Sequence, residues 1–158
     1  MFYKFLFLFL CFEINLIAQQ FNVKIIPDTG NKSIYGVIIK IKADSAIKSA
    51  LGNATLRFNY DNQKLFFPHH PVKGKDFNFE GVDSKKYLCS VTSPTLNTIS
   101  INIFYERGKP ILISDSLYEL VRIYFKKQSN GSYYKLEHFK PEFFSPSSPI
   151  AWDIKVDF

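Results

Sequence analysis

Histidine and cysteine side chains are the groups in this sequence that could bind a metal ion or act as a nucleophile. The histidines are His69, His70 and His138. Neighbouring residues on an extended chain point to opposite sides, so His69 and His70 do not easily share one metal ion. Cys89 lies in an alternating run that lacks the pattern of an activated cysteine. We therefore predict no metal site, no cofactor and no catalytic residue, and we expect Cys89 to be a buried, inert thiol.

The acidic residues are scattered along the chain, so the sequence does not reveal the pair of carboxylates that a glycosidase needs. A small secreted hydrolase, with such a pair formed only in the fold, stays an alternative to a protein without enzymatic activity. Asn59, Asp61 and Asn62 carry oxygen atoms of the kind that Ca²⁺ prefers, but their spacing differs from an EF-hand loop. We interpret Tyr60 and Asp61 as a structural turn, because Asp side chains bond to the backbone two residues further on.

Aromatic residues make up 17% of the chain, which raises the question of carbohydrate binding, in which sugar rings stack on exposed aromatic faces. The candidate contact residues are Tyr133, Tyr134, Phe143, Phe144 and Trp152. Tyr133 and Tyr134 are neighbours, so one of them leaves the core unless both faces of the strand are covered. An exposed pair at Phe143 and Phe144 would mark a contact surface. Trp152 lies in an alternating run and suits the core.

The first residues have the layout of a secretory signal peptide. Lys4 supplies a positive charge, Phe5 to Phe12 forms an apolar segment, and Ala18 is a small residue at the cleavage position. The apolar segment is shorter than the roughly 20 residues that a membrane span needs. We predict a signal peptide at residues 1–18 and a secreted or cell-surface module at residues 19–158, with no membrane span in the mature chain.

The basic residues are spread over the sequence, which carries a formal net charge of +6 at pH 7. They occur singly or in pairs such as Lys85 and Lys86, and do not form the long run that is typical of a nucleic-acid-binding tail. We therefore expect a lysine-rich surface in contact with solvent, and no nucleic-acid partner.

Alternation of apolar and polar residues is the main indication of the fold. It is clearest from Ala54 to Tyr60, where a period of two is typical of a half-buried strand. Turn residues separate similar segments along the chain, which together predict an all-β, antiparallel sandwich of about nine strands. The expected strands are 21–26, 35–42, 54–60, 65–67, 86–92, 99–105, 111–113, 119–127, 133–139 and 150–158, with 43–51 as the only segment of helical character and 140–149 as irregular chain.

The segment Gly52–Asp61, with Leu65 a few residues later, resembles the strand and Tyr-Asp turn of cohesin modules and the related cellulose-binding modules. Ile99–Tyr105 and Leu120–Phe125 resemble strands in the second half of that fold. Ala151–Asp153 is similar to the closing strand of secreted modules from bacteria of the Bacteroidetes group. The resemblance implies a jelly-roll sandwich of about nine strands that recognises a dockerin partner or a polysaccharide and has no enzymatic activity.

We therefore expect a secreted, non-enzymatic binding module whose partner is a polysaccharide or a protein of the cell surface or the extracellular space. A small secreted hydrolase acting on polysaccharide and a purely structural envelope module are the alternatives. The identity of the ligand, the oligomeric state, Ca²⁺ binding and a place in a larger assembly stay open at this point.

Overall fold

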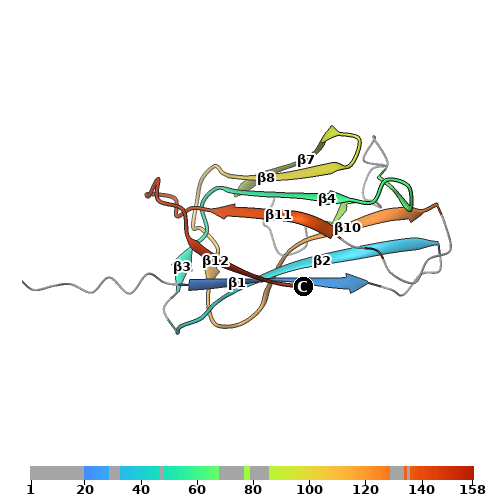
Figure 1. Cartoon of the computed structure of the whole chain (residues 1–158). Helices are drawn as coiled ribbons and strands as arrows, with labels where there is room; N and C mark the ends of the chain where they lie inside the picture. Colours follow the sequence, from blue (N-terminus) through green and yellow to red (C-terminus); the bar gives the residue numbers. More distant parts are fainter. Residues whose placement is uncertain are drawn as a thin grey trace, which may run out of the picture.

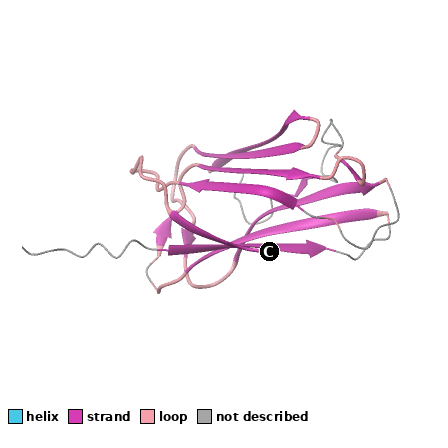
Figure 2. Ribbon diagram, in the orientation of Figure 1, coloured by secondary structure: helices cyan, strands magenta, loops and turns pink. Residues whose placement is uncertain are grey.

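The computed structural model describes residues 20–28, 33–46, 48–67, 77–78, 86–128, 134 and 136–158. All regular structure in these residues is β-strand (Figure 2). Two larger sheets form the two layers of a jelly-roll sandwich (Figure 1), so the predicted all-β fold is confirmed. No helical stretch in the described part has the length and hydropathy of a membrane span. The predicted signal peptide and the residues His69 and His70 lie outside the described residues.

The larger layer is a six-stranded sheet with the order β12-β1-β2-β10-β5, in which β6 also pairs with β10. The first and last strands, β1 and β12, run parallel and hold the two ends of the described chain together. The strands of this sheet are β1 (Gln20–Asp28), β2 (Ile34–Ala43), β5 (Leu65–Phe66), β6 (Phe77–Asn78), β10 (Tyr118–Lys127) and β12 (Asp153–Asp157).

The second layer is a four-stranded antiparallel sheet with the order β11-β4-β8-β7, and a two-stranded ribbon pairs β3 with β9. The strands are β4 (Ala54–Tyr60), β7 (Tyr87–Thr95), β8 (Thr98–Tyr105), β11 (Leu136–Phe143), β3 (Ser49–Ala50) and β9 (Leu112–Ile113).

Two expectations from the sequence about secondary structure are wrong. Segment 43–51 contains bends and β3 in place of a helical turn, because Ala50 and Leu51 bond to the β9 segment. Residues 140–143 are strand, since the edge strand β11 tolerates Pro141.

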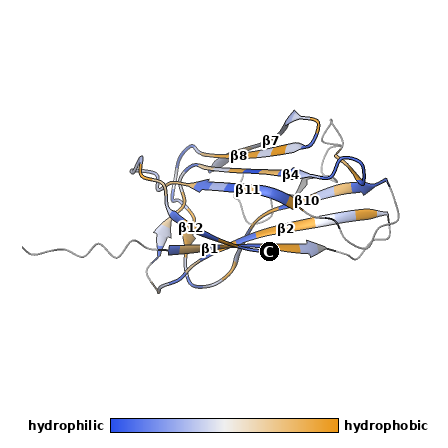
Figure 3. Cartoon of the chain, viewed as in Figure 1, coloured by the Kyte–Doolittle hydropathy of each residue, from blue (hydrophilic) through white to orange (hydrophobic). Residues whose placement is uncertain are grey.

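The core lies between the two larger sheets and consists of every second residue of the strands. Figure 3 shows apolar and polar residues following one another along them. In β4, Leu56 and Phe58 have no exposed surface, while Arg57 between them is exposed. Val37, Ile39 and Ile41 of β2 are buried in the same way from the other layer. Burial of one such side chain stabilises the fold by about 1.5–3 kcal/mol.

A β-bulge interrupts the alternation in β10. The register of β10 against β2 shifts between Glu119 and Val121, so that Leu120 and Val121 are both fully buried. An extra residue in one strand lets two consecutive side chains face the same side. The alternation in the sequence predicts Val121 as a core residue but does not predict that Leu120 is buried as well.

The crossing from the ribbon to β4 is tightly packed at Leu51 and Gly52. The Tyr87 hydroxyl donates a hydrogen bond to the Leu51 carbonyl (2.6 Å) and accepts one from the N–H of Ile111 (3.0 Å). Burial raises the pKa of Tyr87, which keeps the hydroxyl available as a donor. A Cβ added to Gly52 would lie 2.6 Å from the backbone nitrogen of Pro146, so this position requires glycine.

Candidate functional site: the outer face of the four-stranded sheet

The four-stranded sheet turns one side to the core and the other to solvent. In β8, Ile99, Ile101 and Ile103 are fully buried, so the residues between them point outward. The strand register then arranges the outward residues of neighbouring strands in rows across the sheet. We call this surface the outer face, and it consists of Thr55, Arg57, Asn59, Leu88, Ser90, Thr92, Thr98, Ser100, Asn102, Phe104, Glu137, Lys140 and Glu142, of which Ser100 is only 4% exposed.

An apolar pair lies at one end of the outer face. Leu88 of β7 and Phe104 of β8 are directly opposite each other, and 55% and 50% of their surfaces are exposed. The adjacent outward row contains Ser90, Asn102 and Thr55, so polar side chains surround the pair toward the centre of the sheet. Large apolar groups that stay exposed within a polar surface mark a place where another molecule can bind.

Hydrogen bonds between side chains order the polar part of the outer face. The Thr98 hydroxyl donates to Asn59 Oδ1 (2.9 Å), and the Thr95 hydroxyl donates to Thr98 Oγ1 (2.7 Å). Two rows further along, beyond Arg57 and Ser100, the Thr55 hydroxyl donates to Asn102 Oδ1 (3.4 Å). These bonds join three strands and fix the side chains, so little rotamer freedom would be lost when a partner binds.

Two basic residues face each other near the centre of the outer face. Arg57 of β4 and Lys140 of β11 are directly opposite, and both are exposed. They line a surface pocket of about 420 Å³ that also includes Thr95, Thr98 and His138. Cationic groups beside polar side chains suit an anionic group better than a neutral one.

His138 lies at a second β-bulge. The register of β11 against β4 shifts between Glu137 and Lys140, and His138 has a φ of 51°, in the left-handed region. Its side chain borders both the basic pocket and a second pocket of about 570 Å³, whose lining also includes the carboxylates of Asp61 and Glu137. Bulges often redirect a side chain at a functional surface, and here the bulge places an imidazole between the two pockets.

Asp61 is held in the turn that follows β4. Its Oδ1 accepts a hydrogen bond from the N–H of Gln63 (3.0 Å), and its carboxylate lies 3.3 Å from Lys64 Nζ. The bond from Gln63 is the main reason why the pKa of Asp61 lies below its ordinary value. The Tyr60 hydroxyl donates to the Leu96 carbonyl (3.0 Å), and burial raises the pKa of Tyr60. The hydrogen bond from Tyr60 to Leu96 joins the end of β4 to the turn between β7 and β8.

The aromatic residues predicted to contact carbohydrate do not form one exposed row. Tyr133 lies outside the described residues, while Tyr134 and Phe143 are 8% and 0% exposed. Trp152 is partly buried and stacks on Phe21 and Phe143, with ring centroids 4.0 and 6.0 Å apart. Burial therefore leaves the rings of Tyr134 and Phe143 little exposed surface on which a sugar could stack.

Phe144 is the remaining candidate of this group. It is half-buried and borders a pocket of about 530 Å³ together with residues 145–149 of the following loop. Its backbone bridges to Ala151, and the indole of Trp152 donates to Ser145 Oγ (3.0 Å) in the same loop. Phe144 and Trp152 therefore help to close the end of the sandwich, away from the centre of the outer face.

Cys89 lacks the environment of a nucleophile. Cys89 lies on β7 with its side chain against the core, and burial raises the pKa of its thiol to about 11. The thiol is therefore protonated near neutral pH, where a nucleophile needs the thiolate. Within the described ranges, no group of three or more histidine, cysteine or acidic side chains is arranged to hold a metal ion.

The two sheets, the parallel closing pair and the open outer face are those of a cohesin-like β-sandwich. A chain of the CaDoc0917–CaCohA2 complex has 20% sequence identity and a TM-score of 0.61, over 87% of this chain and 94% of that chain. The sixth cohesin of scaffoldin B from Acetivibrio cellulolyticus, solved with a Cel5 dockerin mutant, has 16% identity and a TM-score of 0.60 over the same shares.

A cohesin module from a family 33 glycoside hydrolase of Clostridium perfringens has 12% identity and a TM-score of 0.56, over 89% of this chain and 98% of that module. No protein-family model and no curated protein sequence matches the chain. The likeness therefore establishes the fold, and the predicted cohesin-like sandwich is confirmed at that level.

Sequence reasoning missed the two pairs that characterise the outer face. Phe104 does not follow the every-second-residue pattern of the buried isoleucines of β8, and this pattern could have predicted that its ring is exposed. The pairing of Leu88 with Phe104, and of Arg57 with Lys140, depends on strand order and register. Neither can be read from one sequence, because the paired residues are far apart along the chain.

Proposed function

We propose that the chain is a non-enzymatic binding module that recognises a protein partner through its outer face. The observation that carries this proposal is the open sheet surface with an exposed apolar pair, Leu88 and Phe104, at the edge of an ordered polar region. Protein interfaces commonly combine a few apolar contact residues, which supply most of the binding energy, with polar groups around them.

The cohesin-like fold supports a protein partner. The Acetivibrio cellulolyticus cohesin with this fold was solved in complex with a dockerin, which is itself a protein module. The fold alone does not determine a function, so we infer the kind of partner from the outer face of this chain. The leader sequence supports action outside the cell or at its surface.

Two other functions have less support from the described residues. A glycosidase would need two carboxylates facing each other in a cleft. Asp61 and Glu137 both border the pocket of about 570 Å³, but Asp61 already accepts the N–H of Gln63 and lies 3.3 Å from Lys64 Nζ. A carbohydrate-binding face would need a row of exposed aromatic rings, whereas the exposed Phe104 is paired with Leu88, Tyr134 and Phe143 are buried, and Trp152 stacks on core rings. A polysaccharide ligand is therefore the alternative outcome of the experiment.

The experiment selects binders and then asks where they bind. Fragments encoded by the source genome are displayed on phage and selected on the purified protein, and each binder is titrated against two double variants. Leu88→Ser/Phe104→Ser removes the apolar pair, while Leu117→Ser/Ile150→Ser removes two other exposed apolar side chains outside the four-stranded sheet. All four side chains are exposed, so we expect both variants to fold.

We expect Leu88→Ser/Phe104→Ser to weaken binding by at least about tenfold, equivalent to about 1.4 kcal/mol. The control variant should bind within about twofold of the unchanged protein. Equal losses in both variants would contradict the proposal. Retention of the protein on insoluble cellulose, xylan or chitin, without a fragment that depends on Leu88 and Phe104, would establish polysaccharide binding in its place.

A further inference from the structure

Arg57 and Lys140 form a like-charge pair with no acidic residue in the same row of the described strands. They are directly opposite in the antiparallel pair of β4 and β11. Like charges in this position repel each other and destabilise a sheet. The next residue across the sheet from Arg57 is Ser100, and β11 ends the order of the described strands beyond Lys140. The row therefore contains two cations and no anion.

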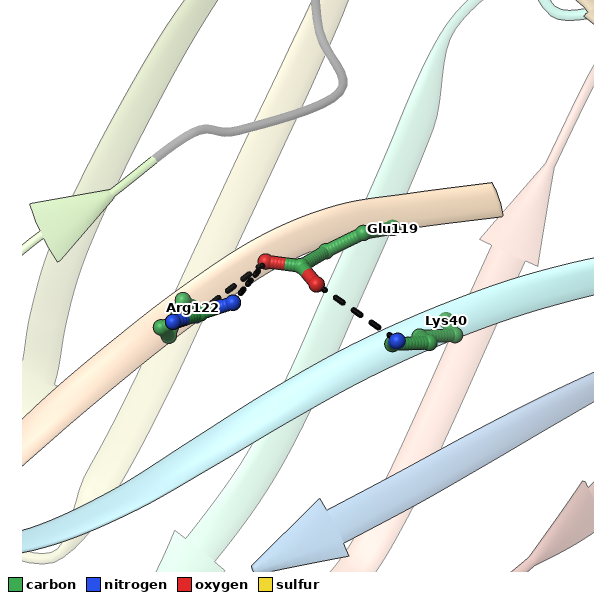
Figure 4. A network of polar contacts seen from close by, with 3 residues as sticks. All are labelled: Lys40, Glu119 and Arg122. Carbon is green, nitrogen blue, oxygen red and sulfur yellow. Dashed lines mark hydrogen bonds and ion pairs between the residues drawn. The ribbon is translucent and has the colours of Figure 1, made fainter. Parts of the chain in front are cut away.

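A similar like-charge pair in the six-stranded sheet has acidic residues beside it. Lys24 and Lys40 are also directly opposite each other, on β1 and β2. Here Asp157 is opposite Lys24 on the other side, and Glu119 is opposite Lys40. Glu119 lies 3.7 Å from Lys40 Nζ and also accepts two hydrogen bonds from Arg122 (2.9 and 3.1 Å; Figure 4). In this sheet each lysine of the pair therefore has an acidic residue beside it.

Acidic residues do lie near Arg57 and Lys140, but in other rows. Glu142 is opposite Thr55 and Glu137 is opposite Asn59, one row to each side of the pair. The register therefore places neither Glu137 nor Glu142 directly opposite Arg57 or Lys140. The pocket of about 420 Å³ over the pair has no acidic residue in its lining. Its neutral lining residues are Asn59, Pro94, Thr95 and Thr98.

We propose that Arg57 and Lys140 form a subsite for a carboxylate of the protein partner, an aspartate or glutamate side chain that binds in the pocket between them. This inference rests on the proposed function, because it describes the partner of the same face. The guanidinium of Arg57 suits a carboxylate geometrically, since it can donate two parallel hydrogen bonds to the two oxygens. The ammonium of Lys140 adds a second positive charge on the opposite strand.

If Arg57 and Lys140 form such a subsite, substitution of Lys140 should change stability and binding in opposite directions. Lys140→Gln removes the repulsion from Arg57, so the variant should unfold at a higher temperature than the unchanged protein. The same substitution removes half of the subsite and should weaken the binding of an acidic ligand. A residue with a merely structural role would lower both, so the two readouts separate the two interpretations.

The test titrates the purified protein with a hexaglutamate peptide at low salt and follows the backbone amides by NMR. A hexaglutamine peptide controls for charge, and hexagalacturonate presents carboxylates on a polysaccharide. The double variant Arg57→Gln/Lys140→Gln is compared with Lys126→Gln/Lys155→Gln, which removes the same charge from exposed residues of the six-stranded sheet.

We expect saturable shifts at β4 and β11 with hexaglutamate, an affinity at least about tenfold lower in Arg57→Gln/Lys140→Gln, and a change within about twofold in the control. Equal losses in both variants would show general charge attraction and overturn the inference. A response to hexagalacturonate alone would also overturn it. Selected protein binders that need Leu88 and Phe104 but tolerate Arg57→Gln/Lys140→Gln would refute the subsite while the proposed function stands.

Discussion

Cys89 illustrates how burial determines chemistry at a single residue. Its thiol faces the core from β7, and burial raises its pKa to about 11. We predict that the thiol reacts with a disulfide reagent at pH 8 at least about tenfold more slowly in the folded protein than in guanidinium chloride. The measurement uses a Cys11→Ser background, in which Cys89 is the only thiol.

The same pKa shift gives a pH dependence of stability. Because the folded pKa of Cys89 is raised, the stabilisation from the neutral thiol is complete below its ordinary pKa of 9.0 and is lost as the pH rises through about 11. Cys89→Ala should remove this part of the alkaline loss. Equal reaction rates in the folded and unfolded states would show that the thiol is accessible and would contradict both expectations.

Asp61 gives the corresponding prediction in acid. Asp61→Ala removes the acceptor for the N–H of Gln63 and the partner of Lys64, so urea unfolding should shift to a lower concentration. Asp61→Asn keeps an acceptor oxygen and should retain more stability. Because the pKa of Asp61 is lowered, its charge stabilises the fold above the ordinary value of 3.8, and this contribution is lost as the pH falls through the folded pKa. An unchanged unfolding midpoint in Asp61→Ala would rule out this role for the turn.

At the scale of strands, the bulge in β11 predicts an unusual response to glycine. His138 has a φ of 51°, where a residue with a Cβ is strained by about 1–2 kcal/mol. His138→Gly relieves that strain at some cost in chain entropy, so we expect a net stabilisation of up to about 1 kcal/mol. His138→Val should destabilise the protein, because a β-branched side chain fits this conformation poorly. Urea unfolding of both variants measures these changes in the free energy of unfolding. A His138→Val variant as stable as the unchanged protein would contradict the predicted strain at this position.

The link between β3 and β4 predicts the opposite response at Gly52. A Cβ at this position would meet three backbone atoms of residues 144–146 at 2.6–2.8 Å, and backbone cannot move aside easily. We expect Gly52→Ala to lower the free energy of unfolding by more than about 2 kcal/mol. Gly108→Ala is the control, because its nearest contact is a flexible side chain at 3.7 Å and only its φ of +85° opposes the change. A similar cost for both would mean that the close approach at Gly52 is unimportant.

Alternation identified most of the strands because each strand has one buried side. The expected segments 54–60 and 99–105 correspond closely to β4 and β8, and 119–127 corresponds to β10. The bulges at Leu120 and His138 were not predictable, since a single inserted residue looks the same as ordinary sequence. The strand β7 also continues past Ser93 and Pro94, because an edge strand does not need every backbone N–H for pairing.

For the molecule as a whole, the sequence predicted the β-sandwich, which is confirmed, but could not show which surface is suited to binding. The outer face exists only after β11, β4, β8 and β7 have been placed side by side. The burial of Tyr134 was not predictable for the same reason: its ring packs against Tyr35 at 4.9 Å between ring centroids, a contact that only the folded chain brings about. Charge and apolar patterns on one sheet therefore carry the functional argument.

The most direct test of this account is a cross-saturation NMR measurement on the complex between the protein and its tightest selected binder. Signals should decrease at the amides of β4, β7, β8 and β11, most strongly near Phe104 and Arg57, while the six-stranded sheet stays unaffected. Signal loss confined to β1, β2 and β10 would place the partner on the opposite layer and would contradict the proposed role of the outer face.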